Sequence, residues 1–314
     1  MKFLRTYIQI LNPKISVLLS LYRGENYLSQ YLDNFLSQTW AEKCELVVIH
    51  NDPSPESIEI INSYACRVNL IYLPRVREGM YASINAGIKA STAPFITIWN
   101  VDDIRTPNSL ELLASALEKS LIYGWSYGDF EISNVYGGGS FSYVTTPEWS
   151  YSVATSSCIG GPFFMFRRSL IGQVGLFDEQ FLSGGDFDFT VRLSLVSNGI
   201  KVRGSLGSFL NERKGLSTSG DLQAIERTVI QRRYGIWKNF DLFYFYASDN
   251  YRCNEIKQGP SSWVNLYDFL PQVKELSESK KFKLLQSLIF TGREFLRRAV
   301  KRIYGGLTRS WLAH

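Results

Sequence analysis

The stretch that decides the fold of this chain is Phe95-Ile96-Thr97-Ile98-Trp99-Asn100-Val101-Asp102-Asp103. Its apolar first half is typical of a buried β-strand, and two adjacent carboxylates follow directly. Thr106-Pro107 comes next and predicts the N-cap and first residue of a helix. Neighbouring acidic groups repel each other, so a fold keeps them together where a cation or hydrogen-bond donors offset their charge. The stretch therefore predicts either a functional site at a strand end or a pair of plain loop and capping residues.

The Asp102-Asp103 pair has the chemistry of a metal site for a diphosphate. Mg²⁺ and Mn²⁺ prefer oxygen ligands, and Mg²⁺ is usually held by one or two carboxylates together with substrate phosphates. No GxGxxG follows the first strand and no GxxxxGK[ST] occurs, which argues against a dinucleotide oxidoreductase and a P-loop enzyme. We therefore expect Mn²⁺ or Mg²⁺ at this pair, with phosphates bound through the metal.

On both sides of this stretch, strand-like runs alternate with helical patterns. Strands are expected at 15–21, 45–50, 70–73 and 95–99, and helices at 26–38, from Ser54 onward, at 79–89 and at 107–121. Such alternation builds a parallel sheet, and apolar runs without polar alternation suit strands that are covered on both faces. The polar clusters after the strands, Ser20 to Arg23, Asn51-Asp52 and Asp102-Asp103, are then expected to meet at one edge of the sheet.

Beyond residue 121 the alternation stops. Residues 126–129 and 141–144, around Gly137-Gly138-Gly139, predict strands and a hairpin at a sheet edge. Gly184-Gly185-Asp186 opens a further helix that runs through Arg192. A carboxylate at a helix N-terminus is electrostatically favoured, so the pKa of Asp186 is expected to be low. Asp186 is either the N-cap of this helix or a reactive base that is held ionised.

Composition limits the cellular compartment and the binding partners that we expect for the protein. The net charge is +5, but the basic residues form no stripe before the C-terminal part, so nucleic acid is not an expected partner. The four cysteines have no CxxC spacing, which predicts reduced thiols. No apolar run approaches the roughly 18 residues of a spanning helix. We expect a cytoplasmic protein, and with only two histidines its acid–base chemistry falls to carboxylates.

Taken in order, these motifs resemble the inverting family 2 glycosyltransferases with the GT-A fold. The resemblance covers about residues 14–237 and implies an α/β fold with a mostly parallel, Rossmann-like sheet, flanking helices and a small antiparallel edge. We expect a lead at 1–13, a catalytic domain at 14–237 and a helical, basic extension at 238–314. The motifs that carry the resemblance are Ile15 to Tyr22, Glu25-Asn26-Tyr27-Leu28, Gln38-Thr39-Trp40, Asn51-Asp52-Pro53-Ser54, Gly79 with Asn85-Ala86-Gly87-Ile88, Asp102-Asp103 and Gly184 to Phe189.

The resemblance implies a role for each matching residue on the nucleotide side. Tyr22 would stack on the base and Ser20 would hydrogen-bond to it. Asp52 would accept the imide N–H of a uracil, because a carboxylate is purely an acceptor. Asp102 would hold the ribose hydroxyls. These roles imply a nucleotide-sugar donor, with UDP as the expected nucleotide.

The resemblance also assigns the chemistry. Asp103 would hold the metal that bridges the two phosphates, and Asp186 would deprotonate the acceptor hydroxyl as it attacks the anomeric carbon in line with the leaving group, which inverts the configuration. The acceptor would be a glycan or a lipid-linked sugar in polysaccharide biosynthesis. Further expected site residues are Glu25, Gly79, Asn85, Gly161, Asp188 and Arg192.

The sequence also departs from the family pattern. Asn51-Asp52-Pro53-Ser54 stands where members usually show Asp-Asp-Gly-Ser, so one carboxylate is lost. Gly185-Asp186 stands where members often carry Glu-Asp, which keeps the base and drops its neighbour. No histidine follows to complete a metal shell, so water and phosphate would fill it. A sugar-nucleotidyltransferase and a non-catalytic nucleotide-sugar or glycan-binding module remain as alternatives.

The C-terminal segment 280–307 has apolar residues at helical spacing among many lysines and arginines. This pattern predicts a basic amphipathic helix. It either docks on the catalytic domain or lies on an anionic membrane surface, which would be the inner face of the cell membrane.

Overall fold

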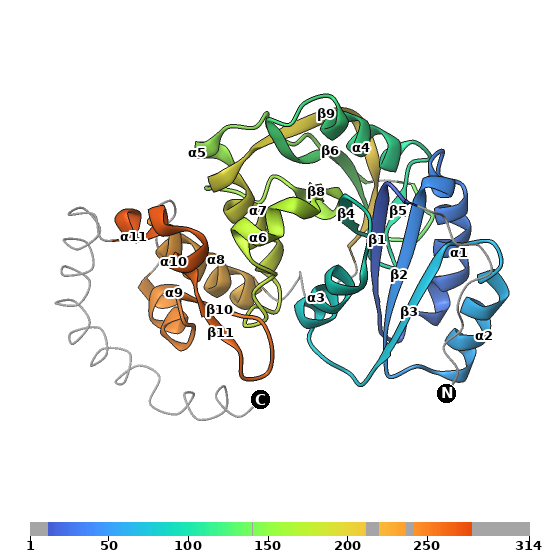
Figure 1. Cartoon of the computed structure of the whole chain (residues 1–314), viewed down its shortest axis with the longest axis horizontal. Helices are drawn as coiled ribbons and strands as arrows, with labels where there is room; N and C mark the ends of the chain where they lie inside the picture. The colour runs from blue at the N-terminus through green and yellow to red at the C-terminus, as the bar shows by residue number, and fades with distance from the viewer. Residues whose placement is uncertain (1–11, 140, 212–219, 237–241, 278–314) are drawn as a thin grey trace.

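The computed structural model describes residues 12–139, 141–211, 220–236 and 242–277, which form an α/β unit with a smaller C-terminal part (Figure 1). A nine-stranded sheet has the order β3-β2-β1-β4-β8-β6-β9-β5, and β7 pairs with β6. Its strands are β1 (Ile15–Leu21), β2 (Cys44–Asn51), β3 (Leu70–Arg75), β4 (Phe95–Ile98), β5 (Ile104–Arg105), β6 (Tyr123–Ser133), β7 (Ser142–Val144), β8 (Met165–Arg167) and β9 (Asn198–Leu210).

The first four strands confirm the predicted parallel sheet. β1 pairs in parallel with β2 on one side and with β4 on the other, and β3 pairs in parallel with β2. The helices between them are α1 (Glu25–Leu36), α2 (Pro55–Tyr64) and α3 (Met80–Ala90). The side chain of Ser54 caps α2 as predicted, with Pro55 as the first helical residue. The carboxyl ends of the four strands therefore lie along one edge.

Both faces of the parallel part are covered, which explains why its strands are apolar without polar alternation. Val17 and Leu19 of β1 belong to the core that includes α1, α2 and α4 (Ser109–Glu118), whereas Leu18 belongs to the core that includes α3. Successive side chains of a strand point to opposite faces, so a strand covered on both faces is apolar throughout. The second core continues over α7 (Gly185–Val196) and α8 (Gly220–Tyr234).

The second half of the sheet is mixed. β8 lies between β4 and β6 and runs antiparallel to both. β9 runs parallel to β6 and antiparallel to the short β5. The antiparallel pairing of β6 with β7 confirms the predicted hairpin, but β6 lies inside the sheet rather than at its edge.

The helix after the acidic pair begins later than the sequence predicts. α4 starts at Ser109 with Asn108 at its N-cap, so the expectation of a helix start at Thr106-Pro107 was wrong. The N–H of Thr106 donates to the carbonyl of Leu206, because β5 pairs with β9 and carries the chain along that strand. The local capping pattern contains no information about this distant pairing.

The last described part holds α8, α9 (Leu242–Ala247), α10 (Leu266–Phe269), α11 (Pro271–Ser277) and a separate antiparallel pair, β10 (Glu255–Lys257) with β11 (Trp263–Asn265). It lies beside α6 (Ile171–Val174) and α7, on the side away from α1 and α2 (Figure 1). The predicted extension is thus not helical throughout, and segment 280–307 lies outside the described residues. Among the residues that the structure describes, no helix has the length and apolar character needed to span a membrane.

Candidate active site

Two residues that the sequence predicts to contact a nucleotide base lie at the end of β1. Ser20, near the end of β1, and Tyr22, just after it, are both half-buried. The guanidinium groups of Arg77 and Arg23 lie 4.4 and 5.2 Å from the centre of the Tyr22 ring. Both distances are within the range of cation–π attraction. The aromatic ring predicted to face a base is therefore flanked by positive charge, and the sequence did not single out Arg77.

Asp52 follows β2 in a left-handed backbone conformation, with φ of 47°. Aspartate tolerates this conformation better than most residues do. Its side chain is exposed, and its Oδ1 accepts the N–H of Arg77 at 2.9 Å. Asn51 is buried instead, and its amide group exchanges hydrogen bonds with the hydroxyl of Ser83 on α3. Asp52 thus presents an exposed carboxylate at the backbone of Arg77, whose guanidinium lies over Tyr22, while Asn51 holds α3 against the sheet.

Asp103 does not fit the expectation of a metal ligand. It is 1% exposed. Its Oδ2 accepts the side-chain amide of Asn100 at 3.1 Å, and its Oδ1 accepts the backbone N–H of Leu210 at 3.3 Å. Its backbone carbonyl accepts the indole N–H of Trp99. Burial, and then the charge of Asp102, raise the pKa of Asp103 well above its ordinary value. Asp103 therefore ties β4 to β9 and presents no oxygen to solvent.

Asp102 is half-buried and lies next to a tyrosine that the sequence did not single out. Tyr136, in the connection between β6 and β7, stacks against Tyr27 of α1 with ring centres 4.9 Å apart. Burial raises the pKa of Tyr136 to about 12, and the charge of Asp102 adds to the shift. The β6–β7 connection thus contacts α1 through Tyr136, within the electrostatic influence of Asp102.

Asp186 is the second residue of α7 and is half-buried. The N-cap is Gly184, so the expectation that Asp186 is the N-cap was wrong. Its Oδ1 accepts the N–H of Phe187 at 2.8 Å, which satisfies one orphan donor of the first turn. Burial nevertheless outweighs these backbone bonds and raises the pKa of Asp186 from 3.8 to about 6. The predicted low pKa was also wrong, because the helix terminus contributes less than the loss of solvent.

A buried glutamate from a distant helix caps the segment that leads into α7. Glu226 of α8 is fully buried and accepts the N–H groups of Leu182, Ser183 and Gly184 at 2.7, 2.8 and 2.6 Å. Tyr251 donates its hydroxyl to the same carboxylate at 3.0 Å. Capping, one of the two alternatives predicted for Asp186, is therefore performed by Glu226. No motif marks Glu226, since its partners are backbone groups more than forty residues away.

Asp188 and Arg192, two of the expected site residues, lie in a buried ion network. Arg192 pairs with Asp188 at 2.9 Å, and Arg233 pairs with Asp188 at 2.6 Å and with Asp178 at 2.8 Å. All four side chains are fully buried, so neither Asp188 nor Arg192 presents a group to a substrate. Arg233 and Arg192 hold the pKa of Asp188 below its ordinary value. The network joins the middle of α7 to α8.

Asn85 is also structural. It is buried, and its amide group bonds both backbone groups of Phe177 at 2.9 Å and the carboxylate of Glu179. It clamps the loop before α7 onto α3. Gly161 has φ of 57°, and a Cβ there would lie 2.9 Å from the ring of Phe130, so the turn at this position requires glycine.

Glu25 and Gly79 lie at helix starts on the strand-end side. Glu25, the first residue of α1, accepts the hydroxyl of Ser54 at 2.6 Å, and this bond lowers the pKa of Glu25. Gly79 is the exposed N-cap of α3, and a Cβ there would meet no atom within 4 Å. The space in front of Gly79 is therefore open.

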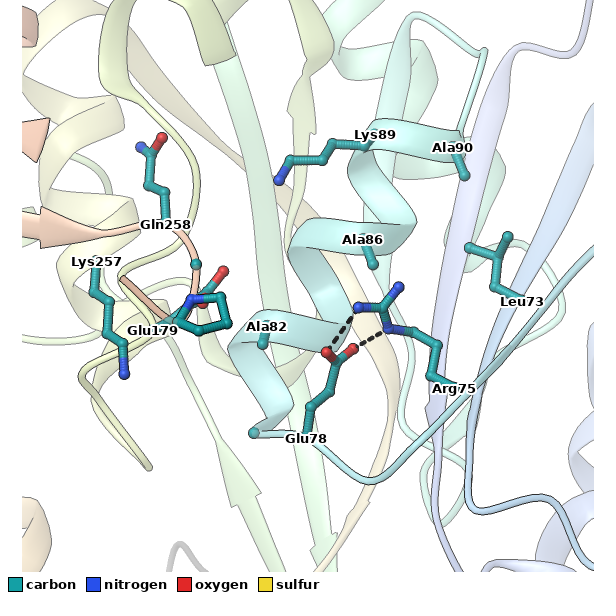
Figure 2. A pocket seen from close by; sticks show the side chains of 13 residues that line it. Leu73, Arg75, Glu78, Ala82, Ala86, Lys89, Ala90, Glu179, Lys257 and Gln258 are labelled. Carbon is teal, nitrogen blue, oxygen red and sulfur yellow. Dashed lines mark hydrogen bonds and ion pairs between the residues drawn. The ribbon is translucent and has the colours of Figure 1, made fainter. Parts of the chain in front are cut away.

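Gly79 also lines a groove of about 780 Å³ along the outer side of α3. Figure 2 shows Ala82 and Ala86 of α3 between β3, which carries Arg75, and the chain around Lys257 and Gln258. The guanidinium of Arg75 pairs with the carboxylate of Glu78 on the groove wall. Of the residues that line this groove, Gly79 alone is a predicted site residue.

Comparison with known families identifies the chain. The model of glycosyl transferase family 2 matches residues 16–175, half of the sequence. The chain belongs to glycosyl transferase family 2. The match ends before α7, so it contains the strand ends with Asp52 and Asp102 but not Asp186.

Curated relatives of this family 2 member are distant. An uncharacterised glycosyltransferase of Rickettsia prowazekii is 25% identical over 204 residues, which is 60% of this chain and 61% of the relative. One from Rickettsia felis is 31% identical over 206 residues, which is 60% of this chain and 33% of the relative. The chain thus spans less than two thirds of the length of either relative.

Solved structures confirm the predicted GT-A fold. Staphylococcus aureus TarS, residues 1–349 in complex with UDP-GlcNAc, superposes with a TM-score of 0.58 at 18% identity, covering 70% of this chain and 64% of that TarS fragment. A mannosyltransferase from Pyrobaculum calidifontis, in complex with GDP-Man and Mn²⁺, superposes with a TM-score of 0.51 at 12% identity, covering 94% of this chain and 88% of that protein.

Proposed function

We propose that this family 2 member is an inverting glycosyltransferase that moves a sugar from a nucleotide diphosphate donor to a hydroxyl of a glycan or lipid-linked acceptor in polysaccharide assembly. The observation that carries the proposal is the pair of half-buried carboxylates at Asp102 and Asp186, which lie in different environments. α3 reaches from the open strand-end side of the sheet at Gly79 to the start of α7, because its Tyr81 contacts the N–H groups of Gly185 and Asp186.

For the donor, Tyr22 and Asp52 are the proposed base contacts. The exposed Asp52 carboxylate suits the imide N–H of uracil, and Arg77, which is fixed by Asp52 through its backbone, places a cation beside Tyr22. Ser20 remains a proposed contact of the base. UDP is therefore the preferred nucleotide of this proposal, which finds a parallel in the UDP-GlcNAc complex of TarS.

For the metal, Asp102 is the proposed ligand in place of Asp103. Among the described residues no group of three acidic, histidine or cysteine side chains could hold a metal ion. One accessible carboxylate nevertheless fits Mg²⁺ or Mn²⁺, because such ions are completed by phosphate oxygens and water. A bound ion would offset the charge that develops on the leaving diphosphate. Asp103 would support Asp102 by fixing β4 against β9.

For the chemistry, Asp186 is the proposed base. A carboxylate with a pKa of about 6 is mostly ionised at neutral pH and is a stronger base than an ordinary aspartate. It would accept the proton of the acceptor hydroxyl while the oxygen attacks the anomeric carbon and the nucleoside diphosphate leaves from the opposite face. The bond to the acceptor oxygen forms as the bond to the phosphate oxygen breaks, so the configuration inverts.

The test combines nucleotide binding with transfer. Calorimetric titration of UDP, GDP and dTDP, each with and without Mn²⁺, is expected to show UDP as the tightest ligand and Mn²⁺ as an enhancer. Asp186→Asn is expected to bind UDP like the wild type and to lose transfer. A protein that ignores all three nucleotides with Mn²⁺ present would refute the proposal, and donor binding without any transfer by the wild type to a panel of glycan acceptors would favour a binding module.

For the acceptor, segment 280–307 supports an approach to a lipid-linked sugar, because its basic pattern suits an anionic bilayer surface. The full chain is expected to co-sediment with anionic but not with neutral vesicles, and a chain that ends at residue 279 is expected to stay in solution. Sedimentation that does not depend on lipid charge would contradict this part of the proposal.

A further inference from the structure

The N-terminus of α7, which carries Asp186, is held by a tyrosine of α3. Tyr81 is 2% exposed. Its hydroxyl oxygen accepts the N–H of Gly185 at 2.9 Å and the N–H of Asp186 at 3.3 Å. These N–H groups belong to the first turn of α7, where the helix itself provides no acceptor. A single phenol oxygen thus satisfies two neighbouring orphan donors at the proposed base.

The same tyrosine explains why glycine precedes Asp186. A Cβ on Gly185 would lie 2.6 to 2.8 Å from carbons of the Tyr81 ring, closer than real contacts allow. The ring is fixed in turn by Phe177, which stacks on it with centroids 5.7 Å apart and planes at 6°. Position 185 is therefore glycine because the aromatic ring occupies the space of a side chain, and the ring cannot move away without leaving Phe177.

Tyr81 also joins the open strand-end side of the sheet to the helix that carries the proposed base. It stands two residues after Gly79, where α3 begins at the open strand-end side of the sheet. Its hydroxyl reaches the backbone of the proposed base on α7, and burial, followed by the nearby charge of Asp186, raises the pKa of Tyr81. No described residue accepts the proton of this hydroxyl, so the hydroxyl acts on α7 purely as an acceptor. Its two bonds fix the backbone from which the Asp186 side chain extends.

We propose that Tyr81 is a positioning residue that orients Asp186 toward the acceptor hydroxyl by accepting the two N–H groups at the start of α7. The inference rests on the proposed function. Without the phenol oxygen, the N–H groups of Gly185 and Asp186 would turn to water, to the Glu226 carboxylate that already accepts the N–H of Gly184, or to the Asp186 carboxylate. Further bonds to the Asp186 carboxylate, which already accepts the N–H of Phe187, would hold it more firmly against its own helix and stabilise its ionised form. The base would then be weaker and misdirected.

The test is Tyr81→Phe, which keeps the ring between Phe177 and Gly185 and removes only the oxygen. We expect faster amide exchange at residues 185 and 186. We also expect kcat to fall by about tenfold to a hundredfold, the scale of one or two lost buried hydrogen bonds. The KM for the donor should stay within about twofold, and the acid limb of the kcat profile should move below its wild-type pH.

Tyr127→Phe is the matched control. Tyr127 is fully buried in β6 and donates its hydroxyl to the carbonyl of Pro147 at 2.9 Å, outside the site. It should cost similar stability in a melting experiment and leave kcat and the acid limb unchanged. Unchanged exchange at 185 and 186 in Tyr81→Phe would overturn the inference, as would faster exchange with a wild-type kcat and acid limb. Absence of transfer by the wild type would instead refute the proposed function.

Discussion

The guanidinium of Arg233 on α8 pairs with the carboxylate of Asp188 on α7 at 2.6 Å, with both side chains fully buried. Arg233 also pairs with Asp178 and donates to the carbonyls of Cys253 and Glu255. One side chain thus joins α7, the loop before it and the chain that leads into β10. The helix that carries the proposed base is fixed by a residue far outside the family match.

Arg233→Ala is expected to destabilise the protein by about 3 to 5 kcal/mol, because Asp178 and Asp188 would remain buried with insufficient positive charge. Chemical denaturation followed by circular dichroism measures the loss. Arg252→Ala is the control, since Arg252 is 55% exposed and its pair with Glu255 should contribute no more than about 1 kcal/mol. Equal losses in the two variants would show that the buried network is not the source of stability.

Asp186→Asn is expected to be more stable than the wild type while it loses transfer. Folding raises the pKa of Asp186 from 3.8 to about 6, so its contribution to stability is present below about pH 4 and is lost as the pH rises through 6. At pH 7.5 the variant should gain about 1 to 2 kcal/mol, discounted for partial solvent exposure. Thermal unfolding at pH 4 and 7.5 checks this, and a gain of equal size at both pH values would contradict it.

The same group is expected to set the pH dependence of transfer. Because the base has to be ionised, kcat over KM should rise with pH through an apparent pKa near 6 and then level off. Initial rates from pH 4.5 to 8.5 give the profile of kcat over KM, and a separate series with saturating donor gives the profile of kcat. A rate that is flat across pH 5 to 7 would exclude Asp186 as the titrating base.

Asp102→Ala and Asp103→Ala are expected to lose different properties, the first the Mn²⁺ effect on UDP binding and the second stability. Asp102→Ala should keep its unfolding midpoint and lose the enhancement of UDP binding by Mn²⁺. Asp103→Ala should lose about 1 to 3 kcal/mol of stability, because the amides of Leu210 and Asn100 would be left without their acceptor. Titration calorimetry and denaturation distinguish them. If Asp103→Ala is stable and loses only the Mn²⁺ effect, the metal ligand is Asp103 after all.

Asp52→Ala is expected to weaken UDP binding by about tenfold, the scale of one charge-assisted hydrogen bond. Its effect on GDP should be much smaller, because guanine presents a different hydrogen-bonding edge. Calorimetry with both nucleotides measures the difference. Asp33→Ala is a suitable control, since this exposed carboxylate of α1 accepts the hydroxyl of Tyr64 of α2 and has no proposed contact with the nucleotide. Equal losses for UDP and GDP would show that Asp52 supports the loop and does not read the base.

The parallel half of the fold was predictable because its determinants are local. Strands such as Ile15–Leu21 are continuous apolar runs, and Ser54 with Pro55 marks the start of a helix by chemistry that acts over three residues. Asp52 and Asp102 were predictable as a strand-end cluster for the same reason. The start of α4 was not predictable, because the N–H of Thr106 donates to the carbonyl of Leu206, a hundred residues later in the chain.

The roles within the site were harder to predict, since burial decides them. Asp102 and Asp103 are neighbours in sequence, yet only the fold shows that one is half-buried and the other enclosed by Asn100 and Leu210. The pKa of Asp186 depends on a balance between helix terminus and desolvation that no motif contains. The capping role of Glu226 was not predictable because the groups that it caps are backbone amides, which leave no sequence motif.

The anchoring of α7 by Glu226 and Arg233 has a consequence for exchanges between homologues. The proposed donor contacts lie before residue 175, whereas both anchors of the helix with the proposed base follow residue 220. A chimera that joins residues 15–175 of this chain to the remainder of another member would inherit its sugar-nucleotide preference from one parent and its acceptor activation from the other. Such a hybrid would fold and transfer sugar only when α7 and α8 come from the same parent.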